Sequence, residues 1–113
     1  MKLMVIVLNK TECLDTLLER FCDAGITGAT ILDSCGMAHS LQGHDELRFI
    51  ASLRLLLDPA RTESKTILTI LRDEEVDLAA NILNEVTGGL EKPDTGVFFT
   101  LNVDRFEGAD TSL

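Results

Sequence analysis

The sequence predicts an α+β domain with the element order βαββαβ, in which an antiparallel sheet carries two helices on one face. Three observations predict it: four short apolar segments with strand character, two amphipathic helical segments, and the recurrence of a β-α-β unit in each half of the 113-residue chain. Right-handed crossovers place both helices on the same face of the sheet. This arrangement is the ferredoxin-like, or split βαβ, fold.

Each element follows from a local pattern. The predicted strands are residues 3–8, 29–34, 66–71 and 96–103. The first of these is apolar at every position, which is typical of a central strand covered on both faces. The first helix follows it and ends at Gly25, and the second begins in the acidic stretch 73–75 and ends at Gly88.

The apolar residues of the first strand predict self-association. Leu3, Val5 and Val7 point to one side of the sheet, and the alternate residues 4, 6 and 8 point to the other. Two helices cover only one side, and a bare apolar sheet face is larger than a monomer normally exposes. We therefore expect a homo-oligomer, or else an insertion that folds over the open face.

Composition and charge narrow the class of protein. We expect one domain over residues 1–108, with an insertion at about 37–64 and a flexible tail at 109–113. A net charge of −9 without a Lys/Arg run argues against nucleic-acid binding, and no apolar run is long enough for membrane insertion. Three cysteines without a CxxC pair are typical of reduced thiols, so we expect a cytoplasmic protein.

Patterns that carry chemistry are sparse. There is no nucleophile elbow and no evident pair of catalytic carboxylates, so we expect a binding protein rather than an enzyme. The glycine-rich segment 87–96 can bring backbone N–H groups close to an anionic ligand, although taken in isolation a helix C-cap followed by a turn is the favoured interpretation and explains Gly88 without any ligand. Cys35, His39 and His44 are candidate metal ligands, but their spacing matches no dedicated metal motif.

Four segments in chain order carry a family resemblance. They are the turn Gly25-Ile26-Thr27-Gly28-Ala29-Thr30, the long insertion after Gly36-Met37, the Thr87-Gly88 loop, and Val103-Asp104-Arg105 after the last strand. With these segments the chain resembles, over almost its whole length, the divergent P-II-like branch of the nitrogen-regulatory signal-transduction family. The insertion corresponds to the T-loop of that family, and the segment after Thr87 to its B-loop.

The resemblance implies a homotrimer that binds a small anionic ligand in clefts between subunits and regulates a target protein, such as a membrane transporter or an enzyme. The ligand-binding residues that it implies are Gly36, Met37, Thr87, Gly88, Gly89, Lys92, Thr95, Gly96 and Arg105. Family members bind adenine nucleotides, but their GDGK motif is replaced here by Gly89-Leu90-Glu91-Lys92, so the cofactor stays open. Two alternatives stay open too: a metal-binding trimer of the divalent-cation-tolerance type, and a protein-interaction module without a small ligand.

Overall fold

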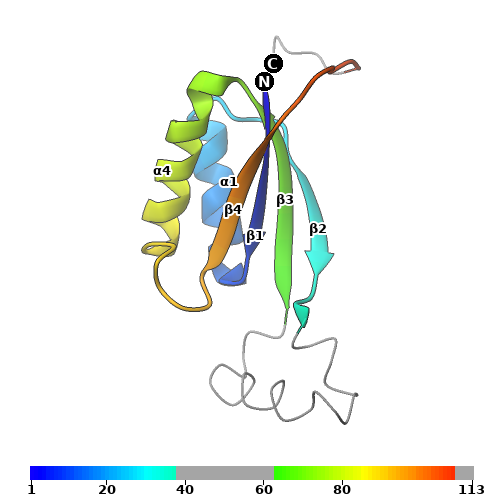
Figure 1. Ribbon diagram of the computed structural model, residues 1–113. Coiled ribbons are helices and arrows are strands. Elements are labelled where there is room, and N and C mark those ends of the chain that lie inside the picture. The colour runs from blue at the N-terminus through cyan, green and yellow to red at the C-terminus, as the bar shows by residue number, and fades with distance from the viewer. Residues whose placement is uncertain (38–62, 109–113) are drawn as a thin grey trace.

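The computed structural model describes residues 1–37 and 63–108, which form one layer of helices against one face of a four-stranded sheet (Figure 1). The strands are β1 (Lys2–Leu8), β2 (Thr30–Ser34), β3 (Ser64–Leu71) and β4 (Gly96–Asn102), and the helices are α1 (Leu14–Asp23) and α4 (Val76–Thr87). Short 3-10 turns at Thr11–Cys13 and Asp73–Glu75 lead into the two helices. The α+β fold with an antiparallel sheet is therefore confirmed.

The strands lie in the order β2-β3-β1-β4, and every neighbouring pair is antiparallel. The strand bounds differ from the predicted ones by at most two residues. The largest difference is at β3, which begins at Ser64, where the sequence predicted the end of the insertion. Ser64 belongs to the sheet because its hydroxyl lies 2.7 Å from that of Ser34, its register partner on β2.

The helix ends follow the glycine signals. Gly25 has a φ of 87°, and the Ile26 N–H bonds to the Phe21 carbonyl at 2.8 Å while the Gly25 N–H bonds to the Cys22 carbonyl at 3.0 Å. This pair of bonds is a Schellman motif, in which a left-handed residue satisfies the last carbonyls of a helix. Gly88 ends α4 with a φ of 86°.

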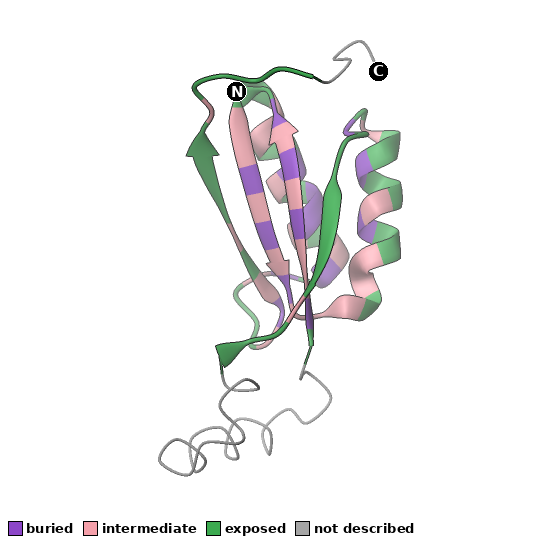
Figure 2. Cartoon of the chain, turned by 90° about the vertical axis from the view of Figure 1, so that its right-hand side faces the viewer, coloured by how far each residue is buried: buried purple, intermediate pink, exposed green. Residues whose placement is uncertain are grey.

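The core lies between the helices and one face of the sheet. Met4, Ile6 and Leu8 of β1 are fully buried there, and Leu17 and Phe21 of α1 pack against them. The rest of the buried cluster consists of Ile26 after α1, Ile67 and Leu71 of β3, and Ala79, Ile82 and Leu83 of α4. Figure 2 shows the alternation of buried and partly exposed positions along the two central strands.

The opposite face of the sheet is uncovered by any described element. We call it the open face, and the register assigns to it Leu3, Val5, Val7, Thr30, Leu32, Ser34, Ser64, Thr66, Leu68, Ile70, Val97, Phe99 and Leu101. None of these side chains is charged, since all three charged strand residues (Lys2, Asp33 and Lys65) lie on the helix side. The prediction that two helices leave one apolar face bare is confirmed for the described residues. The insertion from residue 38 to 62, and with it the suggestion that it covers this face, lies outside them, as does the tail at 109–113.

Candidate functional site

The loop of residues 88–95 joins the end of α4 to the start of β4, as the sequence predicted. Its last residue, Thr95, is buried, and its carbonyl accepts the N–H groups of Asn9 and Lys10 at 3.0 and 3.1 Å. Gly96 follows with a φ of 154°, and a Cβ there would lie 2.7 Å from the carbonyl oxygen of Val7. The loop is therefore anchored on β1, and Gly96 is required by the close approach of the two backbones.

Three backbone amides of this loop donate to the loop itself or to the end of α4. The Gly89 N–H donates to the Thr87 hydroxyl at 3.4 Å, the Leu90 N–H to the Asn84 side-chain oxygen at 2.9 Å, and the Lys92 N–H to the Gly89 carbonyl at 3.2 Å. A backbone nest for an anion needs N–H groups that point outward. These three amides are already engaged, so they do not form such a nest, and the loop's ammonium side chain is the group best placed to meet an anion.

Charged side chains of both signs gather at the same place. The Glu91 carboxylate lies in the space that a Cβ on Gly89 would take, and the Lys92 Nζ lies 3.5 Å from the position of a Cβ on Gly88. Lys10 contributes a second ammonium group, which donates to the Thr87 carbonyl at 3.0 Å and so compensates the negative end of α4. The loop thus holds the Glu91 carboxylate against Gly89, while the Lys92 and Lys10 ammonium groups lie at Gly88 and at the Thr87 carbonyl. The sequence reasoning named Lys92 but missed Glu91 and Lys10.

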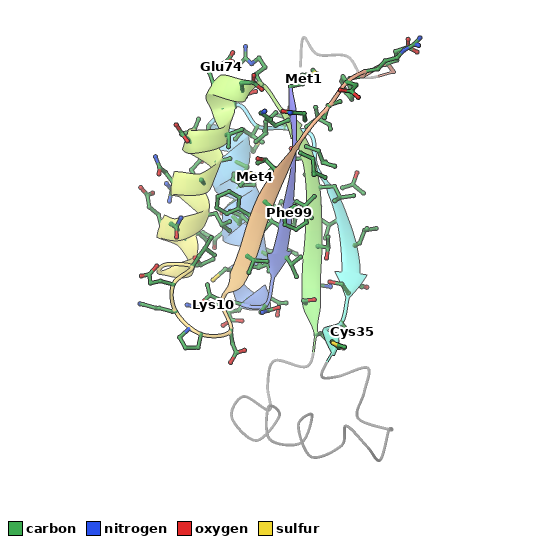
Figure 3. All side chains as sticks on the ribbon, in the orientation of Figure 1. Met1, Met4, Lys10, Cys35, Glu74 and Phe99 are labelled. Atoms are coloured by element: carbon green, nitrogen blue, oxygen red, sulfur yellow. The ribbon has the colours of Figure 1, made fainter. Side chains whose placement is uncertain are left out.

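Gly36 and Met37 follow β2 at this same end of the sheet. Ser34 pairs with Ser64, and Lys65 pairs with Leu8, so the end of β2 and the start of β4 lie at the same end. Figure 3 shows Cys35 and Lys10 at this end and Met1 at the other. However, β2 and β4 are the two edges of the sheet, about 14 Å apart across three strand spacings. Within one chain, the predicted Gly36–Met37 part of the site therefore lies apart from the loop.

Arg105 lies at the opposite end of the sheet. It follows Asn102, which pairs with Lys2, whereas Gly96 pairs with Leu8. The seven-residue strand β4 therefore places about 20 Å between Arg105 and the loop. Its Nε donates to the Glu107 carboxylate at 2.9 Å. Arg105 can join the loop residues in one site only if it comes from another subunit.

A second feature, which the sequence reasoning did not find, is an open cavity of about 850 Å³ at the Arg105 end. Its apolar wall includes Ile26, Leu68, Ile70 and Phe106, and its rim is the turn before β2. The buried Thr69 hydroxyl donates to the Gly28 carbonyl at 2.5 Å and fixes this turn. The Gly25–Thr30 motif could have indicated the turn, but only the fold brings Phe106 next to it.

Ion pairs surround the polar side of this cavity. The Arg72 N–H and guanidinium both donate to the Glu75 carboxylate, at 2.9 and 3.1 Å. The backbone hydrogen bond from Arg72 holds the pKa of Glu75 below its ordinary value, and the hydrogen bond to Glu75 raises the pKa of Arg72. The N-terminal ammonium of Met1 pairs with Asp73 at 3.1 Å. The positive charges here are therefore compensated within the chain.

Of the three candidate metal ligands, one lies within the described residues. Cys35 is an exposed thiol just beyond β2, whereas His39 and His44 lie outside the described residues. Over residues 1–37 and 63–108, no three His, Cys, Asp or Glu side chains cluster as a metal site requires. The proposed Cys35-His39-His44 set therefore stays a prediction.

Comparison with known proteins gives no family assignment: no family model matches the chain, and no curated protein matches it. Among the described helices, none has the length and apolar character needed to cross a bilayer. The function must therefore be argued from the geometry of the chain itself.

Proposed function

We propose that this protein is a ligand-responsive regulator, which assembles from identical subunits, binds a small anionic molecule at the loop of residues 88–95, and controls a target protein without covalent chemistry. The observation that carries the proposal is the position of the Glu91 carboxylate. It occupies the space above Gly89 in a loop that also carries Lys92, and the Lys10 ammonium group, which comes from the segment after β1, bonds to the end of α4 where this loop begins. A ligand carboxylate or phosphate could replace this internal anion with little rearrangement of the backbone.

The hydrogen bonds of the loop support a preformed site. Because the Gly89 and Leu90 amides are held by the end of α4 and the Lys92 amide by Gly89, binding costs little further ordering of the backbone. Selectivity for an anion then comes from Lys92 and Lys10, whose ammonium groups form charge-assisted hydrogen bonds. Displacement of Glu91 is the local change that ligand binding would produce.

Assembly from identical subunits is supported by the uncharged open face, whose projected area is about 400 Å² from strand spacing and length. Apolar patches of this size commonly mark an interaction site. The resemblance adds a second argument: it implies a site that joins the loop to Arg105, and because these lie at opposite ends of β4, such a site can form only across a subunit boundary. In the trimer suggested by the P-II-like resemblance, Arg105 of one subunit would complete the anion site of the next.

The test is a thermal-shift panel with adenine nucleotides, bicarbonate and divalent metals, because a ligand that binds only the folded state raises its melting temperature. We expect one of the anions to raise the melting temperature of the wild type. Glu91→Gln should bind it more tightly, because the competing carboxylate is gone, and Lys92→Met more weakly. Glu19→Gln, the same change on the exposed surface of α1, is the matched control. Equal shifts in all four proteins, or no shift with any anion, would contradict the proposal.

A second candidate is a protein-interaction module without a small ligand. The three engaged amides of the loop favour it, since they leave the loop structurally complete as it is. This candidate predicts no shift with any member of the panel, together with an oligomer that still forms through the open face.

A further inference from the structure

The two edges of the sheet differ in how they are protected. Edge strands expose unpaired backbone N–H and C=O groups, and proteins usually blunt them with charges, proline, bulges or short length. The edge strand β2 is five residues long and carries Asp33, which pairs with Lys65. The edge strand β4 has none of these protections. It is seven residues long, contains no charged residue and no proline, and pairs one-to-one with β1 from Gly96 to Asn102 without a bulge.

The side chains of β4 are also poorly covered on both faces. Val97, Phe99 and Leu101 on the open face are exposed by 58, 48 and 52%. On the helix side, Thr100 and Asn102 are exposed as well, and only Phe98 packs against the core. Figure 2 shows this edge strand as almost continuously exposed. An uncharged, regular and exposed edge strand is a ready template for pairing with another strand.

We propose that β4 pairs edge to edge with a strand of a second copy of this chain, so that the sheet continues from one subunit into the next. Net charge restricts where a second copy can approach. Each chain carries −9, so two copies repel one another except where they meet through uncharged surface. Residues 96–102 form such a surface, and it is continuous with the open face through Val97, Phe99 and Leu101.

This inference rests on the self-assembly in the proposed function, and it adds how the subunits meet. Packing through the open face alone would leave the outer edge of β4 in water. Pairing through β4 uses the backbone groups of that edge and gives its three apolar side chains cross-strand neighbours on one side, although the open face itself stays uncovered. The two modes differ in the hydrogen bonding of β4, and that difference can be measured.

The experiment is amide hydrogen exchange on the wild type, at a concentration where light scattering shows an oligomer. Alternate amides of a strand point to opposite edges, so in β4 about half bond to β1 and half point outward. Edge pairing predicts slow exchange at every amide between residues 97 and 102. An oligomer whose alternate β4 amides exchange rapidly overturns edge pairing but leaves the assembly of the proposed function intact. A monomer overturns both.

A charge placed on the edge gives an independent test. Thr100→Lys adds a lysine to the helix side of β4, away from the open face, and should raise the concentration at which the oligomer dissociates by tenfold or more. Asn81→Lys makes a similar change on the exposed surface of α4 and should leave it unchanged. Circular dichroism of both dilute variants checks that the subunit still folds. Equal dissociation of a folded Thr100→Lys variant and the wild type would count against edge pairing.

Discussion

Replacement of Phe99 by alanine tests whether the open face holds the subunits together. The Phe99 side chain lies on this face opposite Val5 of β1 and is 48% exposed in the single chain. A phenylalanine offers roughly 200 Å² of surface, so about 100 Å² is left for a partner to cover. At about 25 cal/mol per Å² that area contributes about 2.5 kcal/mol per subunit. Since alanine retains a small part, Phe99→Ala should weaken association by about 2 kcal/mol per subunit, or roughly 30-fold.

The assay is light scattering coupled to size-exclusion chromatography over a dilution series. Leu78→Ala is the matched control, because Leu78 is a large apolar side chain that is 42% exposed on α4, away from the open face. We expect Phe99→Ala to dissociate at a higher concentration than the wild type, and Leu78→Ala to match the wild type. If the two variants dissociate together with the wild type, the open face is not the subunit interface.

Three further predictions concern the stability of the fold. Gly96→Ala should lower the free energy of unfolding by more than about 2 kcal/mol in chemical denaturation. Its Cβ would meet a carbonyl of β1 at 2.7 Å, and the φ of 154° disfavours a side chain. An unchanged denaturation midpoint would show that β1 and β4 can move apart at this position without cost. Thr69→Val should cost about 1–2 kcal/mol, since it removes the hydrogen bond to the turn before β2, and faster amide exchange in that turn should accompany it. The backbone hydrogen bond from Arg72 lowers the pKa of Glu75 in the folded protein. The ionised Glu75 carboxylate therefore stabilises the fold fully above the carboxyl pKa of the unfolded chain, and this contribution is lost as pH falls through the lower pKa of the folded state. Glu75→Gln should therefore be less stable than the wild type near neutral pH and approach it in acid, and a difference that persists unchanged in acid would refute the linkage.

Much of the fold could be read from local patterns. The apolar run in β1, the strand character of β3 and β4 and the glycines after each helix all act over a few residues, so their effect is visible without a partner segment. Gly25 and Gly88 were predicted as helix ends, and both have the positive φ that this role requires. The start of β3 was placed two residues late, because Ser64 enters the sheet through its pairing with Ser34, far away in the sequence.

The candidate site was less predictable. The sequence groups Gly36, Thr87 and Arg105 as one set. In the fold, Gly36 follows the edge strand β2, the loop after Thr87 leads into the opposite edge strand β4, and Arg105 lies at the far end of the sheet. Glu91 reads as one acidic residue among many, and only the folded loop places its carboxylate against Gly89. Distances of this kind depend on which strands become neighbours, and that is decided by contacts between distant segments.

The sequence by itself determined that this chain forms a sheet with apolar residues on both faces and has two helices to cover them. Hydrophobic periodicity is a local property, so each element and its buried side follow from the order of residues. Only the tertiary structure decided which side the helices cover, which edge strand is left unprotected, and which charges meet at the loop after α4. Those outcomes depend on strand order and register, which are set by long-range pairing and by the packing of one apolar face at the expense of the other.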